Sequence, residues 1–208
     1  MSEYRTVKKG ATAEFEDRRS RFIGAVIPIS TEQEAIDFIN KRRSETFGAR
    51  HNVYAYILRD GNIARYSDDG EPHSTAGMPT LDVLKKNGLT DVCVVTTRYF
   101  GGVLLGTGGL VHAYTAAAKG AVEAAGIAVM RECCLCRAVC EYNDHRRLEQ
   151  TLTDGGGQIC DTEFTDKVSV SFTVPECGYE VLKAKVTDSL CGRVEPEILG
   201  KIWADSEE

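Results

Sequence analysis

The chain carries near its middle the stretch Arg98-Tyr99-Phe100-Gly101-Gly102-Val103-Leu104-Leu105-Gly106-Thr107-Gly108-Gly109-Leu110. It follows an almost continuous apolar run from Asp91 to Thr97, which is typical of a central strand covered on both faces. An alanine-rich segment comes directly after it. Five glycines in one connection are costly, because glycine loses more backbone freedom on folding than any other residue. We therefore expect left-handed dihedrals or a close backbone approach in this strand-to-helix loop.

The alanine-rich segment predicts a helix that ends at Gly126. Its apolar residues fall on one stripe, and so many alanines would let the helix lie close to a sheet. The members of this stripe are Leu110, Ala113, Tyr114, Ala117, Ala118, Ala121, Val122 and Ala125. His112 lies on the opposite side of this helix, so we expect it to be exposed.

The segment before the glycine loop alternates strands with helices. Alternation and turn residues predict strands at 4–7, 11–15, 22–29, 51–58 and 62–66, with a hairpin turn at Asp60-Gly61. Capping-box spacing predicts a helix that starts after Ser30 or Thr31 and ends before Gly48. Its basic residues 41–43 are expected mostly on the solvent side. A further helix is predicted from near Thr75 to Lys86.

After Gly126 the composition shifts and a second unit begins. Its expected order is strand, helix, strand, strand, helix, strand, over about 127–142, 144–152, 158–164, 168–174, 178–190 and 197–203. That order is the split βαβ or ferredoxin-like arrangement. We therefore predict an α+β protein with two domains, at 1–130 and 131–208.

Composition limits the class of protein. The 208 residues have the hydrophobic and charged content of an ordinary globular chain, and the first thirty residues contain neither a signal-peptide core nor a long apolar run. We expect a cytoplasmic protein with no membrane partner. Up to Met130 there are 16 Lys and Arg against 15 Asp and Glu, whereas the remainder has 9 against 16. A contact with nucleic acid would therefore involve the first domain, because such binding depends on phosphate neutralisation.

The eight cysteines match no zinc or disulfide spacing. On a strand, Cys134, Cys136 and Cys140 would share one face with Ala138. Zinc ligands usually come in pairs on turns, so we favour buried free thiols over a metal site. We expect no metal and no cofactor.

An acidic turn precedes the second helix, in the sequence Ser67-Asp68-Asp69-Gly70-Glu71-Pro72-His73-Ser74-Thr75. Its three carboxylates and one histidine would suit a divalent cation, but the spacing is not that of a calcium loop. Alternatively, Asp and Ser side chains would cap the helix that begins near Thr75. We favour capping.

The glycine loop offers a second candidate site. Backbone N–H groups of Thr107, Gly108 and Gly109 at a helix start would bind an anion. The pattern matches neither the Walker nor the dinucleotide-binding fingerprint, so the motif is weak evidence for phosphate chemistry. We predict one ligand or partner surface formed by the acidic turn and the glycine loop, with the residues Asp68, Asp69, Glu71, His73, Thr75, Arg98, Tyr99, Gly102, Thr107, Gly108 and Gly109.

Several motifs taken together resemble the YigZ family of bacteria and the IMPACT proteins of eukaryotes. They are Ser20-Arg21-Phe22-Ile23-Gly24, His51-x-x-Tyr54-Ala55-Tyr56, Ser67-Asp68-Asp69-Gly70-Glu71-Pro72, Thr75-Ala76-Gly77 and the run from Thr97 to Leu110. The resemblance covers nearly the whole chain, and its C-terminal part is similar to the extra domain of the bacterial two-domain branch.

The resemblance implies a fold for each domain and a general function in translation. The first domain would have the left-handed βαβ fold of the second domain of ribosomal protein S-five. The second domain would be ferredoxin-like, similar to the last domain of elongation factor G. Eukaryotic relatives regulate translation under stress, and proposals for the bacterial branch centre on nucleic-acid or ribosome-associated binding. Two positions depart from the usual pattern, since Leu104 replaces a lysine and His73-Ser74 replaces a Ser-Gly pair.

Two functions follow as hypotheses. The first is a translation- or stress-related regulator that binds RNA or a ribosome-associated protein through the first domain, with Arg18, Arg19, Arg21 and Arg50 as nucleic-acid contacts. The second is a small-molecule or phosphate-binding enzyme that uses the glycine loop and the turn from Asp68 to His73. Alternatively, the cluster of Arg18, Arg19 and Arg21 is exposed to solvent without binding a partner, as is usual for short basic clusters. We favour binding over catalysis, while the sequence names no small-molecule ligand and no oligomeric state.

Overall fold

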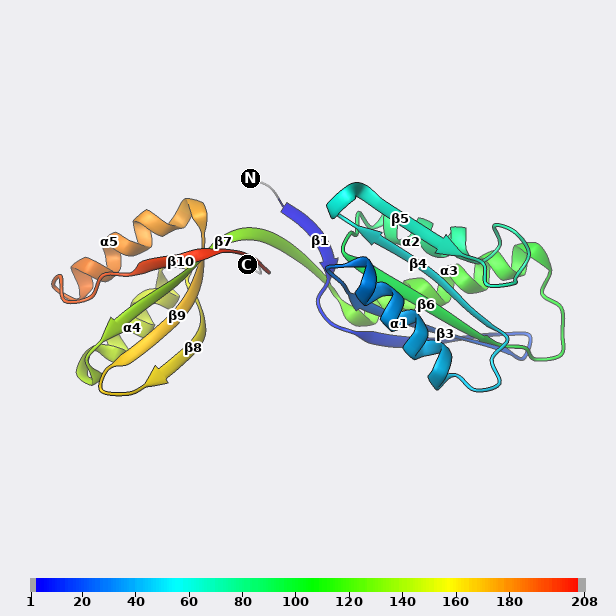
Figure 1. The fold of residues 1–208 in the computed structure, drawn as a ribbon, viewed down its shortest axis with the longest axis horizontal. Helices are drawn as coiled ribbons and strands as arrows, with labels where there is room; N and C mark the ends of the chain where they lie inside the picture. The colour runs from blue at the N-terminus through cyan, green and yellow to red at the C-terminus, as the bar shows by residue number, and fades with distance from the viewer. Residues whose placement is uncertain (1–2, 206–208) are drawn as a thin grey trace. The chain divides into compact units, whose positions relative to one another are not determined.

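The computed structural model describes residues 3–205 and shows an α+β protein built from two compact units (Figure 1). The first unit comprises Tyr4–Ala128, and Val129 begins the main part of the second. Within residues 3–205, no helix combines the length and the apolar character needed to cross a membrane.

The first domain contains a five-stranded sheet with the order β2-β3-β6-β4-β5. The four pairings in this order are all antiparallel, so β3 and β4 run parallel on either side of β6. Because α1 connects β3 to β4 around β6, the domain contains a split βαβ unit. The hand of that crossover stays a prediction. The element bounds are β1 Glu3–Val7, β2 Ala11–Asp17, β3 Ser20–Pro28, α1 Glu32–Glu45, β4 His51–Leu58, η1 Asp60–Asn62, β5 Ile63–Ser67, α2 Gly77–Lys86, β6 Val92–Tyr99 and α3 Gly106–Ala125.

Helices cover both faces of this sheet, with α1 on one face and α2 and α3 on the other (Figure 1). Strand β6 shows the consequence, because its side chains alternate between two cores. Val92 and Val94 belong to the core under α2 and α3, whereas Cys93 and Val95 belong to the core under α1. The prediction of a central strand covered on both faces is confirmed.

Helix α3 buries its predicted stripe against the sheet. All eight stripe residues are buried, and Gly126 ends the helix with a φ of 71°. The helix can approach β3 closely because Gly24 has no side chain. A Cβ at Gly24 would overlap the backbone carbonyl group of Ala117. His112 is exposed, as its position on the helix predicted.

The second domain has the ferredoxin-like order that the sequence predicted. Its elements are β7 Ile127–Cys140, α4 Tyr142–Asp154, β8 Gln158–Phe164, β9 Val168–Pro175, η2 Glu176–Gly178, α5 Tyr179–Ser189 and β10 Glu197–Asp205. The strands pair in the order β10-β7-β9-β8, and each of these pairings is antiparallel. Since β9 lies between β7 and β8, the strands joined through α4 flank a third strand, which defines the split βαβ unit.

The cysteine-rich strand β7 supplies the core of this domain. Cys134, Cys136 and Cys140 are buried together with residues of α4 and α5. This confirms the interpretation of a small-residue core face. Cys133 is also buried, which alternation did not predict. Within residues 3–205, no group of three His, Cys, Asp or Glu side chains is arranged to hold a metal ion.

Two local differences from the sequence prediction affect the site. Strand β6 continues to Tyr99, because Arg98 and Tyr99 still pair with residues of β3. Arg98 is therefore a strand residue and not the first residue of the loop. In α1, the side chain of Arg42 is only 16% exposed, so the expectation of a solvent-facing basic cluster is wrong for this residue.

We predict that Gly24→Ala lowers the stability of the first domain. The added methyl group collides with the backbone of α3, so the free energy of unfolding should fall by at least about 2 kcal/mol in urea titrations followed by circular dichroism. Gly108→Ala is the matched control, because Gly108 has open space and lies in a helix. This control should gain up to about 1 kcal/mol. Equal effects of the two variants would contradict the close approach.

Cysteine reactivity tests the burial of the thiols. Burial raises the pKa of Cys93 to about 12 and that of Cys136 to about 11. Because the thiolate is the nucleophile, iodoacetamide at pH 8 should modify only the exposed residues Cys160, Cys177 and Cys191 in the native protein. Mass spectrometry should find all eight cysteines modified in urea. Rapid native modification of Cys134 or Cys136 would contradict the core assignment.

Candidate functional site

The predicted site residues of the first domain gather at one end of its sheet. Strand register places Arg21 opposite Tyr99 and places Arg98 between Phe22 and His51. The β2–β3 turn, the end of β6 and the start of β4 therefore meet at this end. The segment that follows β5 carries the acidic turn to the same place (Figure 1). We call this end of the domain the sheet-end surface.

A buried ion pair lies beneath the sheet-end surface. Nη1 of Arg98 donates to Oε1 of Glu71 over 2.6 Å, and the two side chains are only 8% and 4% exposed. The hydroxyl of Tyr114 donates to the same oxygen over 2.8 Å. The guanidinium carbon of Arg98 lies 5.5 Å from the ring centroids of both Phe22 and Phe100. Helix α3, strand β6 and the acidic turn are thus joined at one carboxylate.

The proton of Tyr114 stays on the phenol. Burial raises its pKa above the ordinary value, and the neighbouring carboxylate of Glu71 raises it further. Tyr114 is therefore a permanent hydrogen-bond donor here and not an acid-base catalyst at neutral pH.

Asp68 caps helix α2. Its carboxylate accepts hydrogen bonds from the backbone N–H groups of Ser74, Ala76 and Gly77, over 2.9, 3.1 and 2.8 Å. These donors belong to the start of α2 and to the residues before it, where a helix leaves N–H groups without partners. The capping interpretation of the acidic turn is confirmed for Asp68.

Asp69 holds the acidic turn to its neighbours. One carboxylate oxygen accepts from the guanidinium of Arg43 over 2.8 Å, and the other accepts from the backbone N–H of Asn52 over 2.7 Å. The carbonyl oxygen of Asp69 also accepts from Nδ1 of His51 over 2.7 Å. All three carboxylates of the turn thus have internal partners.

The prediction of a shared ligand surface needs correction for some of its members. Glu71, Arg98 and Thr75 are interior groups, and the hydroxyl of Thr75 donates to the carbonyl oxygen of Pro72 over 2.6 Å. Sequence patterns missed the burial of Glu71 and Arg98 because charged residues are usually exposed. They also gave no sign that Tyr114 is a partner of Glu71.

Other predicted residues do reach the surface. His73 is exposed, with its Nδ1 2.7 Å from the hydroxyl of Ser74. Tyr99 is half-buried, and the guanidinium of Arg21 lies 5.9 Å from its ring centroid. The remaining exposed members are Gly102, Thr107, Gly108, Arg18, Arg19, Arg21 and Arg50. Among these arginines, Arg21 forms an ion pair with Glu14.

The glycines of the loop have different roles. A Cβ at Gly101 would overlap the carbonyl group of Arg19, and the N–H of Gly101 donates to the hydroxyl of Ser20 over 3.2 Å. Gly102 and Gly106 have φ angles of 84° and 74°, which other residues rarely adopt. Gly108 has neither feature. A close approach is therefore found at Gly101, within the protein, whereas the interpretation of Gly108 as a position of close backbone approach is wrong because the space around it is open.

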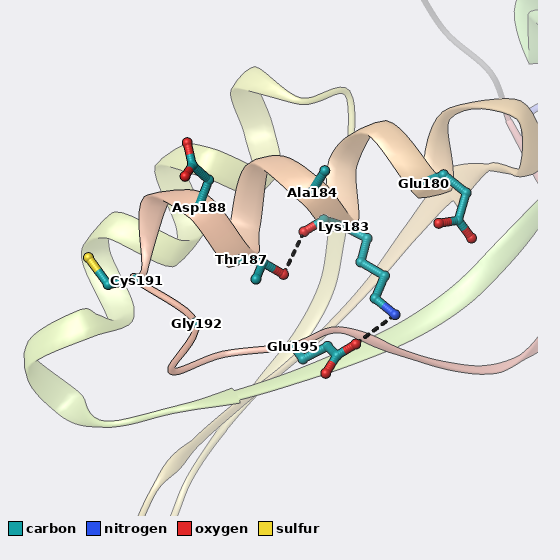
Figure 2. Close-up of a pocket in the computed structure, with 8 residues that line it drawn as sticks. All are labelled: Glu180, Lys183, Ala184, Thr187, Asp188, Cys191, Gly192 and Glu195. Atoms are coloured by element: carbon teal, nitrogen blue, oxygen red, sulfur yellow. Dashed lines mark hydrogen bonds and ion pairs between the residues drawn. The ribbon is translucent and has the colours of Figure 1, made fainter.

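The second domain has a groove between α5 and the segment that leads to β10 (Figure 2). Its volume is about 610 Å³. The ammonium of Lys183 pairs with Glu195 over 2.7 Å, and Glu180 and Asp188 add two further carboxylates to the lining. The net charge of the groove is therefore negative, which disfavours phosphate ligands.

Comparison with known proteins identifies the family. A family model described as the Impact N-terminal domain matches residues 18–122, which is about half of the 208-residue chain and includes the whole sheet-end surface. The chain belongs to the IMPACT family. A second model, described as a domain of unknown function (DUF1949), matches residues 139–193. The resemblance on which the sequence interpretation relied is confirmed.

Individual relatives of this IMPACT family member include bacterial and eukaryotic proteins. IMPACT family member YvyE of Bacillus subtilis is 35% identical over 85% of this chain and 82% of its own length. An IMPACT family member of Haemophilus influenzae is 31% identical over 96% and 98%. The Protein IMPACT homolog of Dictyostelium discoideum is 37% identical over 46% and 29%. A crystal structure titled as that of an hypothetical protein aligns over 96% of this chain and 98% of that chain, with a TM-score of 0.61 and 28% identity.

We predict that Glu71→Gln destabilises the first domain by about 3–5 kcal/mol, because it leaves the charge of Arg98 buried without a counterion. Urea unfolding at neutral pH measures this loss. Tyr114→Phe is the control, since it removes one hydrogen bond from Glu71 and leaves the ion pair, and it should lose only about 1 kcal/mol. A loss below that of Tyr114→Phe would show that the ion pair does not hold the turn.

Proposed function

We propose that this protein is a translation-related binding module that contacts RNA through the sheet-end surface of its first domain. The observation that carries the proposal is the pair of exposed arginines in the β2–β3 turn. Arg18 and Arg19 have left-handed backbone angles, with φ of 44° and 68°, and the glycine loop packs directly against their turn. Their guanidinium groups are therefore presented from a backbone that is held in place.

Aromatic side chains lie beside these charges. Tyr99 is half-buried under Arg21, and Phe100 at the start of the glycine loop is 44% exposed. Arginines interleaved with aromatic rings suit RNA, because guanidinium groups bind phosphate while aromatic faces stack on unpaired bases. The family theme of translation control, which the resemblance implies, agrees with such a partner.

The charge distribution favours the first domain as the binding part. Its 16 basic residues up to Met130 nearly balance 15 acidic ones, whereas the rest of the chain has 9 against 16. An acidic domain repels the phosphate backbone, so it would restrict which RNA can approach. The enzyme alternative loses support, because Asp68, Asp69 and Glu71 all bind other parts of the protein.

We predict that the triple variant Arg18→Gln, Arg19→Gln, Arg50→Gln weakens RNA binding by roughly tenfold or more in about 100 mM salt. Each lost phosphate contact should also lower the slope of affinity against salt concentration by about one. Band-shift titrations with a structured ribosomal RNA fragment at several salt concentrations measure both effects.

Its control is the second-domain triple variant Arg146→Gln, Arg147→Gln, Lys185→Gln, which removes the same charge from the acidic half. This control should bind RNA as the wild type does. An absence of wild-type binding to RNA and to ribosomes would end the proposal. Ribosome association that does not change in the first triple variant would instead point to a protein partner.

A further inference from the structure

A second groove lies in the first domain, away from the glycine loop. It runs between α1 and the strands β2 and β3, and its volume is about 320 Å³. The groove exists because α1 packs on β4 and β6. The same face of β2 and β3 is left as a floor beside the helix. Nothing in the family comparisons or the proposed function assigns a role to this groove.

The floor and one wall of the groove are apolar. Ile27 and Phe38 lie at the edge of the core under α1 and also line the groove. Ala25 is buried at the floor. Gly10 lets the chain pass close to Ile27, since a Cβ there would lie 3.3 Å from its methyl group. A flat apolar or aromatic body therefore finds a complementary surface.

Arg42 gives this groove an unusual cation. Its side chain is only 16% exposed, and its Nε has no hydrogen-bond acceptor within the described part of the chain. Its Nη1 lies 3.5 Å from a carboxylate oxygen of Glu45. A guanidinium has five N–H donors and is costly to bury without strong partners. Arg42, which lines the cavity, thus has a buried Nε without an acceptor among residues 3–205 and an Nη1 that is paired only loosely, with Glu45.

Glu45 holds two cations loosely. Its carboxylate lies 3.5 Å from Arg42 and 3.9 Å from the ammonium of Lys41, and its side chain is 47% exposed. Both distances exceed those of a strong charge-assisted hydrogen bond. An incoming anion can therefore replace Glu45 against both cations while the carboxylate turns into water.

We propose that this groove binds a small phosphomonoester with an apolar or aromatic body. A phosphomonoester carries close to two negative charges at pH 7, which matches Lys41 and Arg42 together. The volume corresponds to a single small ligand, at the lower end of ligand pockets. A long polyanion fits poorly, because Glu14 and Glu16 follow Thr12 on the same face of exposed strand β2.

The experiment is isothermal titration calorimetry of the full chain with adenosine 5′-monophosphate and with inorganic phosphate. The nucleotide should bind one site per chain and more tightly than phosphate, which lacks the apolar body. Arg42→Gln should weaken nucleotide binding by roughly tenfold, because it removes charge-assisted hydrogen bonds. Glu45→Gln should tighten it, because the competing carboxylate is gone.

Two controls separate this site from the sheet-end surface. Lys119→Gln removes one charge from α3 on the other face of the sheet and should leave nucleotide affinity unchanged. The triple variant of Arg18, Arg19 and Arg50 should also keep it. If the arginine triple variant loses RNA binding but keeps nucleotide binding, the groove proposal stands. If Arg42→Gln loses nucleotide binding but keeps RNA binding, the proposed function stands.

Four results would overturn the proposal. These are no nucleotide binding by the wild type, unchanged affinity in Arg42→Gln, tighter binding of benzoate than of the nucleotide, and displacement of the nucleotide by an RNA oligomer. Thermal melts establish whether Arg42→Gln is folded. If it is not, weaker or unchanged binding in Glu45→Gln overturns the proposal by itself.

Discussion

The buried ion pair between Arg98 and Glu71 is a strong constraint on the fold of the first domain. Both side chains are almost fully buried, so neither charge has an alternative partner in water. Breaking the pair would leave a buried charge, which is far more costly than the pair is stabilising. The acidic turn must therefore return to the end of β6. With the turn in place, Asp68 reaches the N–H groups at the start of α2, and Asp69 reaches Asn52 on β4.

This arrangement divides the conspicuous residues of the sequence into two groups. Carboxylates of the acidic turn face inward and set the positions of α2 and β4, whereas arginines of the β2–β3 turn face outward. Gly101 connects the groups, because it follows β6 closely and packs against Arg19. The groups that remain available to bind a partner at this end of the sheet are consequently exposed cations and aromatic rings. Because the carboxylates of the acidic turn already bind other parts of the protein, the structure does not favour a metal-binding or acid-base role for this turn.

Periodicity predicted the elements well, because helices and strands that pack on one core must repeat their apolar residues at fixed intervals. The eight-residue stripe of α3 and the alternating cores around β6 are such cases. The end of β6 and the pairing of Glu71 with Arg98 were not predictable in this way. The end of β6 depends on pairing with the distant strand β3, and Glu71 is 27 positions from Arg98. Charge in a sequence also normally indicates exposure. The sequence therefore assigned Glu71 and Arg98 wrongly to an exposed surface, because it does not show in which direction a side chain points.

Arg42 shows that a position on the apolar face of a helix can be occupied by a charged residue. Ala35, Ile39 and Arg42 are spaced by four and three residues, so they share one face of α1. Ala35 and Ile39 are buried, and the aliphatic stem of Arg42 extends that apolar face, with most of the side chain buried beside the groove. A leucine at position 42 would bury the same surface without the cost of a charged group. The arginine is thus better explained by what its guanidinium can bind in the groove than by the packing of its stem.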